Sequence, residues 1–215
     1  MSKKIEDMRQ KYGEISLSPE NVNSHPFQQF KDWFKVASES DILEPNAMTL
    51  ATVSKEGTPS ARIVLLKGID DTGFIFYTNY ESQKGKQLLE NPKAAVIFYW
   101  DTLHRQVRIE GTTEKVSKAT SDAYFQKRPK GSQIGAWASP QSQLIGDRSI
   151  LEKNKLDLEN KYSSTDNVPR PPHWGGFRIK PQRIEFWQGR NNRLHDRIVY
   201  EKRAKESWEI FRLAP

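Results

Sequence analysis

The strongest candidate for chemistry is a short charged segment near the C-terminus. The five residues Arg193-Leu194-His195-Asp196-Arg197 supply two guanidiniums, an imidazole and a carboxylate, shortly after the aromatic stretch Glu185-Phe186-Trp187-Gln188-Gly189. Ionised side chains are rarely buried without partners, but they suit a pocket that holds a planar anion. A charged hairpin tip that serves only solubility is the alternative interpretation.

A second group of candidate residues lies far upstream, in the run Arg62-Ile63-Val64-Leu65-Leu66-Lys67, where two cations bracket an apolar segment. We expect this run and the C-terminal cluster to meet in space. Other polar side chains that interrupt apolar segments are cations, amides and hydroxyls, the types that bind phosphates and heterocycles. They are Thr78, Ser82, Lys84, Gln106, Arg108, Tyr124, Arg128, Ser132, Gln141 and Ser142.

The spacing of the remaining polar residues disfavours hydrolysis and metal catalysis. The four histidines, at positions 25, 104, 173 and 195, show neither a Ser-His-Asp order nor a metal-ligand spacing. The sequence contains no cysteine, which excludes disulfides, thiolate nucleophiles and cysteine-based zinc sites and fits a reducing compartment. No metal ion is therefore expected.

Length, composition and charge bound the class of protein. A chain of 215 residues with 28% charged residues and 11% aromatic residues predicts one folded, aromatic-rich unit. The net charge of +7 admits a nucleic-acid-binding module, but the basic residues are scattered and form no zinc or helix-turn-helix pattern, so we assign the charge to small phosphorylated ligands. No apolar run approaches the roughly 20 residues of a membrane span, and the charged start lacks a secretion signal, so we expect a cytoplasmic protein.

Hydrophobic periodicity predicts a mainly β protein with peripheral helices. Residues 1–24 are polar and predict a mobile N-terminal arm, followed by a single domain over 25–215. Helices are predicted after the caps Ser24, Ser82 and Ser121, the third followed by a Pro and Gly loop, and a longer helix over about 143–162. Strands are predicted at 48–53, 61–66, 74–78, 94–100, 107–114, 176–179, 184–188, 197–200 and 208–213. Five early and four late strands favour a closed barrel over an open sheet.

Five blocks of sequence, in order, resemble the pyridoxine (pyridoxamine) 5'-phosphate oxidase family over nearly the whole chain. They are the run 62–67, Phe76-Tyr77-Thr78-Asn79, Arg105-Gln106-Val107-Arg108-Ile109-Glu110-Gly111, Ser132-Gln133-Ile134-Gly135-Ala136-Trp137-Ala138-Ser139, and Trp187-Gln188-Gly189 with 193–197. The resemblance implies a mainly β fold with α elements (α+β), a split β-barrel of the FMN-binding type with peripheral helices. It also implies a homodimer that holds FMN between its subunits.

The resemblance further implies which residues hold FMN. Those of one subunit would be Arg62, Ile63, Val64, Leu65, Leu66, Lys67, Tyr77, Thr78, Lys84 and Gln106, and those of its neighbour Gln141, Ser142, Trp187 and Arg197. Arg62 and Lys84 would bind the FMN phosphate. The family often carries a basic residue just before this lysine, so Gln83 predicts weaker FMN affinity without a change in the chemistry.

For the substrate, the resemblance implies a 5'-phosphate site and a ring site. The phosphate would be bound by Lys67, Tyr124, Arg128 and Ser132. Arg193, Leu194 and His195 would lie against the pyridine ring, with Arg193 and His195 as catalytic candidates, and Arg9 and Tyr12 of the arm would close the pocket.

The activity that the resemblance implies belongs to vitamin B6 salvage or biosynthesis. Pyridoxamine or pyridoxine 5'-phosphate would be oxidised by O2 to pyridoxal 5'-phosphate and H2O2, with ammonia released from the amine. FMN would take a hydride equivalent from the C4' carbon, so the protein's part is to hold that carbon, exclude water and supply polarity. The alternative is a split-barrel module that binds flavin or haem without catalysis, and such a module is expected to lack the substrate-phosphate residues found here.

Several of these residues also have a purely structural interpretation. Trp137 and Trp174 are expected in the core, and Gly175-Gly176 in a tight turn without a ligand. Arg108 and Glu110 are expected to pair across strands, and Lys127 and Lys130 to be solvated.

Overall fold

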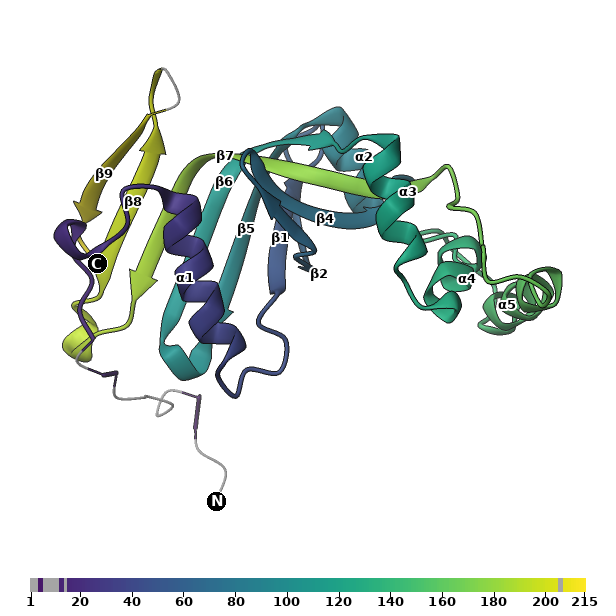
Figure 1. The fold of residues 1–215 in the computed structure, drawn as a ribbon, viewed down its shortest axis with the longest axis horizontal. Helices are drawn as coiled ribbons and strands as arrows, with labels where there is room; N and C mark the ends of the chain where they lie inside the picture. Colours follow the sequence, from purple (N-terminus) through teal and green to yellow (C-terminus); the bar gives the residue numbers. More distant parts are fainter. Residues whose placement is uncertain (1–3, 6–11, 14, 205–206) are drawn as a thin grey trace. The chain divides into compact units, whose positions relative to one another are not determined.

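The computed structural model of the protein describes residues 4–5, 12–13, 15–204 and 207–215, and over these it is a mainly β structure with peripheral helices (Figure 1). Its strands are β1 (Ala47–Val53), β2 (Pro59–Leu65), β3 (Gly68–Asp70), β4 (Gly73–Asn79), β5 (Lys93–Trp100), β6 (Arg105–Lys115), β7 (Trp174–Gln188), β8 (Asp196–Lys202) and β9 (Trp208–Leu213). Hydrogen bonds order them as β2-β1-β5-β6-β7-β4-β3, with β8 between β7 and β9. Among the described strands this path runs from β2 to β3 and does not return to its start, so the ring favoured by strand counting is not formed.

The helices are α1 (Pro26–Ser38), α2 (Gln83–Glu90), α3 (Lys118–Gln126), α4 (Lys130–Ala138) and α5 (Ser149–Lys161), with short 3-10 turns at Pro19–Asn21, Asp101–Leu103 and Asn191–Arg193. The chain forms two compact units. The first contains the residues up to 49 together with 96–110 and 181–215, and the second contains 50–95 and 111–180. The predicted division into an arm over 1–24 and one domain over 25–215 stays a prediction.

In the first unit, α1 packs an aromatic face on the strands, as its residue spacing predicts. The ring of Phe30 lies 5.0 Å from that of Phe98, and Trp33 meets Phe186 edge to face at 5.2 Å. Pro26 stands in the first turn, where a missing backbone N–H costs nothing, but the N-cap position is occupied by His25 and not by the predicted Ser24. The helix is therefore confirmed and its start is corrected.

The segment just before α1 is bonded to the C-terminal hairpin of the same unit. The backbone N–H of Leu17 donates to Asp196 Oδ2 at 3.0 Å, and Arg212 Nη2 donates to the carbonyl of Leu17 at 2.7 Å. Tyr200 Oη donates to the carbonyl of Asn23 at 2.6 Å. Residues 17–23, which belong to the predicted arm, are thus fixed on β8 and β9.

In the second unit, β4 pairs antiparallel with the first half of β7, from Phe74 opposite Ile179 to Asn79 opposite Trp174. The helix α2 begins after Ser82 as predicted, because the Ser82 Oγ accepts from the N–H of Gly85 at 3.3 Å. The short strand β3 was not predicted from the sequence. A single β7 replaces two predicted strands at 176–179 and 184–188.

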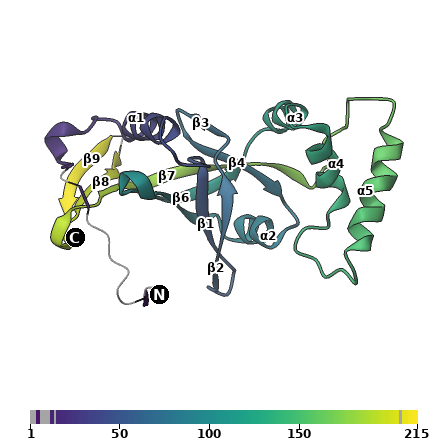
Figure 2. The ribbon, with the colours of Figure 1, turned by 90° about the horizontal axis from the view of Figure 1, so that it is seen from below.

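The helices that follow in the second unit differ from the prediction. The cap of α3 is Ser117, whose Oγ accepts from the N–H of Thr120 at 3.0 Å, whereas Ser121 is buried inside the helix and accepts from the N–H of Gly176. The helix α4 lies where a loop was predicted. The last helix, α5, is shorter than predicted, has no buried residue, and lies beside α4 (Figure 2).

The two adjacent glycines of β7 form part of the strand, so the predicted tight turn is wrong. A Cβ on Gly175 would lie 2.1 Å from Tyr80 Oη, and one on Gly176 would lie 2.7 Å from Val116 Cγ2. Glycine is needed here because other side chains approach the strand closely. This close packing holds α3 against the start of β7.

Candidate functional site

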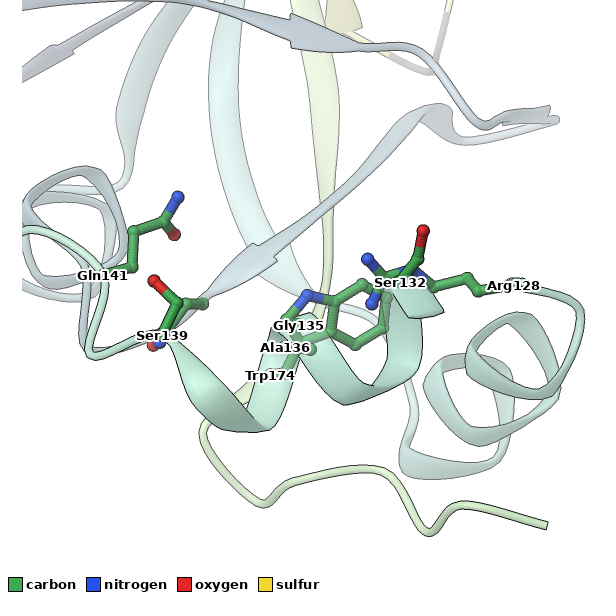
Figure 3. A pocket seen from close by; sticks show the side chains of 8 residues that line it. Arg128, Ser132, Gly135, Ala136, Ser139, Gln141 and Trp174 are labelled. Carbon is green, nitrogen blue, oxygen red and sulfur yellow. The ribbon is translucent and has the colours of Figure 1, made fainter. Parts of the chain in front are cut away.

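The second unit contains a pocket of about 730 Å³ that collects most of the predicted binding residues. It is lined by Arg62, Ile63, Val64, Leu65, Lys67, Tyr77, Thr78, Asn79, Lys84, Tyr124, Lys127, Arg128, Pro129, Ser132, Gln141 and Trp174. A recess of about 280 Å³ shares five of these residues and adds Gly135, Ala136 and Ser139 of α4 and the residues after it (Figure 3). The sequence blocks at 62–67, 76–79 and 132–139 are thereby brought to one place.

Arg62 and Lys84 both line the pocket, and the Arg62 guanidinium is held by neutral groups. Arg62 Nη1 donates to Thr52 Oγ1 at 2.5 Å, and Arg62 Nη2 donates to Ser60 Oγ at 2.7 Å. Both hydroxyls in turn donate to Gln87 Oε1, at 2.6 and 2.8 Å. Burial lowers the pKa of Arg62, and burial followed by the charge of Arg62 lowers the pKa of Lys84. Because the Arg62 guanidinium donates to neutral hydroxyl groups, its positive charge is suited to an added anion.

The first turn of α2 adds backbone N–H groups and a favourable helix dipole next to Lys84. Lys84 is the second residue of α2, where free backbone N–H groups and the helix dipole favour negative charge. A Cβ on Gly85 would lie 2.4 Å from the carbonyl oxygen of Tyr80 and 2.5 Å from that of Asn79. The glycine therefore lets the helix start close against the end of β4, which carries Tyr77 and Thr78.

Arg128, another cation that lines the pocket, has a buried guanidinium nitrogen. Its Nη1 and the Oε1 of Gln133 are the buried side-chain polar atoms that lack a hydrogen-bond partner over the described ranges. Burial lowers the pKa of Arg128, and nearby Tyr124 opposes this shift. Ser132 and the exposed Lys67 line the same pocket. An orphaned cationic donor near two hydroxyl groups is suited to a phosphate.

Parallel aromatic rings also line the pocket. Tyr77 and Tyr124 stack with ring centroids 3.9 Å apart and an interplanar angle of 10°, and Trp174 is parallel to Tyr77 at 5.4 Å. Burial raises the pKa of both tyrosines, so their phenols stay protonated and can donate hydrogen bonds. Trp174 is buried, as expected for a core residue, and it also lines the pocket.

The C-terminal cluster lies in the first unit, where it forms an aromatic group. The ring of His195 lies 4.6 Å from Trp187, and Tyr12 meets His195 edge-on at 5.2 Å and His104 at 4.9 Å. The backbone N–H of Arg190 donates to His195 Nδ1 at 3.0 Å, so the neutral ring carries its proton on Nε2. Burial, and then the charge of Arg193, lowers the pKa of His195. The imidazole is therefore neutral at neutral pH.

The remaining predicted site residues differ in burial and in whether they line the pocket. Leu66 is buried, and Gln106 and Ser142 do not line the pocket over the described residues. Arg193 and Leu194 are exposed, and Arg9 lies outside the described residues. Gln141 lines the pocket of its own chain. Since residues 62–67 belong to the second unit and residues 193–197 to the first, their expected meeting stays a prediction.

The structure also adds residues that the sequence analysis missed. Thr52, Ser60 and Gln87 fix Arg62 and were not predicted, although two of them interrupt apolar strands in the way that marked other candidates. Arg108 pairs with Glu110 within β6 at 2.5 Å and with Glu185 at 3.6 Å, so the predicted pairing partner is confirmed, but the two residues lie on one strand. Lys130 pairs with Asp166, and Lys127 is exposed at the pocket rim.

Within the described ranges, no group of three His, Cys, Asp or Glu residues could hold a metal ion. None of the helices described above has both the length and the apolar character needed to span a bilayer. A mainly antiparallel sheet with peripheral helices and a pocket lined by cations defines a class of β proteins suited to small anionic ligands.

Comparison with known proteins narrows this class. The chain belongs to the pyridoxamine 5'-phosphate oxidase family, because residues 35–162 match the family model described as pyridoxamine 5'-phosphate oxidase. Residues 174–215 match the pyridoxine 5'-phosphate oxidase C-terminal dimerisation region. The family and the fold predicted from the sequence are thereby confirmed.

Full-length relatives agree with the family models. The chain is 56% identical over 215 residues to the pyridoxine/pyridoxamine 5'-phosphate oxidase of Gloeothece citriformis, with all of both chains covered. It is 53% identical to the protein of the same name from Salinibacter ruber, with 99% of each chain covered. Among solved structures, PhzG from Burkholderia lata in complex with tetrahydrophenazine-1-carboxylic acid is 32% identical, with a TM-score of 0.86 over 93% of this chain and 98% of that chain.

Proposed function

We propose that the protein is an FMN-dependent oxidase that converts pyridoxamine 5'-phosphate and pyridoxine 5'-phosphate, with O2, to pyridoxal 5'-phosphate and H2O2. The observation that supports this most is the pocket of the second unit, which is lined by several cations and by parallel aromatic rings. Such a pocket is suited to phosphorylated, planar molecules. Relatives more than half identical over the full length carry the name of this activity.

The cation pair at α2 fits the FMN phosphate. Arg62 and Lys84 are partly buried, the Arg62 guanidinium donates to neutral hydroxyl groups, and the start of α2 adds backbone donors. Gln83, which is exposed next to Lys84, leaves this site with one cation fewer than the family often has. Bound FMN would supply the hydride acceptor and the reaction with O2.

A second set of pocket residues, which includes Arg128, fits the phosphate of the substrate. Arg128 and Lys67 would give two positive charges to the dianion, and Tyr124 and Ser132 would give hydroxyl donors. Charge-assisted hydrogen bonds of this kind are roughly twice as strong as neutral ones. These residues would hold the vitamin by its phosphate and leave its ring to the parallel aromatic rings.

The match of residues 174–215 to a dimerisation region supports a homodimer. In that dimer we propose that Trp187 and Arg197 of the neighbouring subunit, with its Gln141 and Ser142, complete the FMN site. Arg193 and His195 would lie against the pyridine ring, Leu194 beside them, and Arg9 and Tyr12 would close the pocket. Because the lowered pKa keeps His195 neutral, its role would be to orient the ring through Nε2. The absence of cysteine fits a cytoplasmic location.

The decisive experiment is an anaerobic titration of the purified protein with pyridoxamine 5'-phosphate. The protein should be yellow, with absorbance near about 450 nm, and the substrate should bleach it. Admission of O2 should restore the colour with formation of pyridoxal 5'-phosphate. A yellow protein that is not bleached would indicate the non-catalytic flavin module, and a colourless protein that does not take up FMN would contradict both.

A further inference from the structure

Arg128 depends on aromatic rings for its position. Its Cζ lies 4.6 Å from the centroid of the Trp174 ring and 5.5 Å from that of Phe125, while its buried Nη1 makes no hydrogen bond. A half-buried guanidinium is costly without a compensating partner, and the face of a tryptophan is the strongest aromatic partner for a cation. The indole therefore stands where a carboxylate would otherwise hold the guanidinium (Figure 3).

An aromatic partner, unlike a carboxylate, leaves the N–H groups of the Arg128 guanidinium free to bind a ligand. A carboxylate would neutralise Arg128 and occupy the N–H groups that a phosphate needs. The ring stabilises the charge through its face, so the edge of the guanidinium and its donors remain available. This arrangement suits a residue that must bind a dianion and release it again.

Trp174 is itself held rigidly from several sides. Its ring is 7% exposed, parallel to Tyr77 at 5.4 Å and edge-on to Phe125 at 5.2 Å. Its backbone carbonyl accepts a hydrogen bond from Arg170 Nη1. Rings packed on this many sides have few alternative rotamers, so the surface under Arg128 is fixed before any ligand arrives.

Arg170 connects this tryptophan to α3, the helix that carries Tyr124, which is also proposed to bind the substrate phosphate. The Arg170 side chain is 10% exposed, and its Nε donates to Asp122 Oδ1 at 2.6 Å. Asp122 lies on α3, two residues before Tyr124 and six before Arg128. The start of β7 and α3 are thus joined by an ion pair between a largely buried guanidinium and a carboxylate that is 44% exposed.

We propose that Trp174, held by Arg170, is a positioning residue that sets the Arg128 guanidinium for the substrate phosphate and thereby determines affinity for phosphorylated ligands. Trp174 does not take part in the oxidation. The identity of the phosphorylated substrate rests on the proposed function, whereas the effect on phosphate binding does not. A tryptophan that served only as core would contribute to stability alone.

The test compares Trp174→Leu and Trp174→Phe with Trp137→Leu. Trp137 packs against the same small core cluster and donates to the carbonyl of Pro169 at 2.7 Å, but it does not line the pocket. We expect Trp174→Leu to raise KM for pyridoxamine 5'-phosphate about tenfold with kcat changed less than about threefold, as the loss of a partly desolvated cation–π contact predicts. Trp174→Phe should recover most of the affinity.

A second measurement separates binding from catalysis. Inorganic phosphate, titrated into the FMN-loaded protein, should bind Trp174→Leu about tenfold more weakly, in parallel with KM, while the dissociation constant of FMN stays within about twofold. Trp137→Leu should lower the melting temperature but leave KM and phosphate binding unchanged. Equal KM and phosphate affinity in Trp174→Leu and wild type, or equal losses in the two tryptophan variants, would overturn the proposal.

Two further experiments cover the cases in which Trp174→Leu does not fold or the proposed oxidase activity is not found. If Trp174→Leu does not fold, Arg170→Lys takes its place. It keeps the charge but loses the planar guanidinium, whose separate Nε and Nη1 atoms bond Asp122 and the Trp174 carbonyl, so it should raise KM about threefold and leave kcat unchanged. If the wild-type protein binds phosphate but does not oxidise pyridoxamine 5'-phosphate, the proposed function fails while the phosphate titration still decides the role of Trp174.

Discussion

The guanidinium of Arg197 forms a two-point ion pair with the buried carboxylate of Glu185. Arg197 Nε donates to Oε1 at 2.8 Å and Nη2 donates to Oε2 at 3.1 Å, and Glu185 is 3% exposed. Two further arginines approach the same carboxylate, Arg108 at 3.6 Å and Arg183 at 3.9 Å. Glu185 therefore orients Arg197, which lies opposite Trp187 in the register of β7 and β8.

Replacing Glu185 by Gln should weaken FMN binding about tenfold, if Arg197 contacts FMN as proposed, because the guanidinium loses its fixed direction. It should also lower the free energy of unfolding by about 2 kcal/mol, since three partly exposed arginines lose the buried carboxylate that they share. Fluorescence titration of the apoprotein with FMN and urea unfolding measure the two effects. The matched control is Glu110→Gln, whose carboxylate is 41% exposed and pairs with Arg108 at 2.5 Å. Unaltered FMN affinity in the Glu185 variant would remove Arg197 from the cofactor site.

Lys84→Met should raise the FMN dissociation constant about tenfold or more, because a charge-assisted contact to a phosphate contributes about 1.5–3 kcal/mol. Lys86→Met, two residues further along α2 and exposed, should leave it unchanged. Gln83→Arg should tighten FMN binding by supplying the cation that this chain lacks. In all three variants kcat at saturating FMN should stay near that of the wild type. Equal effects of the two lysine substitutions would place the phosphate elsewhere.

The lowered pKa of His195 predicts how activity depends on pH. The ring is neutral above its folded pKa, which lies below the ordinary value of 6.5, so activity should hold as pH falls through 6.5 and decline only at lower pH. The unfolded chain binds this proton more readily, so stability that is present at neutral pH decreases as pH falls below 6.5.

Arg193→Leu should move the acid limb of the kcat/KM profile to higher pH, because it removes the second cause of the shift and leaves burial, the first. It should also reduce turnover with FMN saturated. An NMR titration of the His195 ring gives the pKa directly. A turnover and a Michaelis constant both equal to those of wild type would remove Arg193 from the site.

Asp70→Asn should lower stability only at neutral pH. Burial would raise the pKa of Asp70, but hydrogen bonds from Arg178 and Thr72 outweigh it and bring the pKa to about 2. A lowered carboxyl pKa gives stability that is present above the unfolded value of 3.8 and is lost as pH falls toward 2. After allowance for a side chain that is 38% exposed, we expect a loss of about 1 kcal/mol at pH 7 and none at pH 2, measured by urea unfolding. A loss of the same size at both pH values would show that the ion pair is not its source.

Local patterns were sufficient for the elements whose residues carry strong spacing or capping rules. The aromatic spacing of α1 and the Ser82 cap of α2 predicted both helices, and alternation predicted most strands to within a few residues. The errors fell where a tertiary contact overrides the local rule. Ser121 has the chemistry of a cap, but it is buried inside α3 because its Oγ accepts the N–H of Gly176 across 55 residues of sequence.

For the pocket, too, the sequence predicted some features and only tertiary contacts determined others. The types and order of the residues in five blocks identified the family, and the resemblance to that family then pointed to the cations at 62, 67, 84 and 128 as phosphate-binding residues. Three neutral partners of Arg62 were missed, since a hydroxyl or amide becomes a guanidinium ligand only when distant strands and helices bring it within hydrogen-bonding distance.

The sequence by itself determined which chemical groups the protein has for holding phosphates and which family it belongs to. Only the tertiary structure decided that Arg128 is supported by the ring of Trp174 instead of a carboxylate, and that Arg197 is committed to Glu185. The physical reason is that a residue's type fixes its charge and hydrogen-bonding capacity, whereas its partners, its burial and hence its pKa depend on segments that are distant in sequence and meet only on folding.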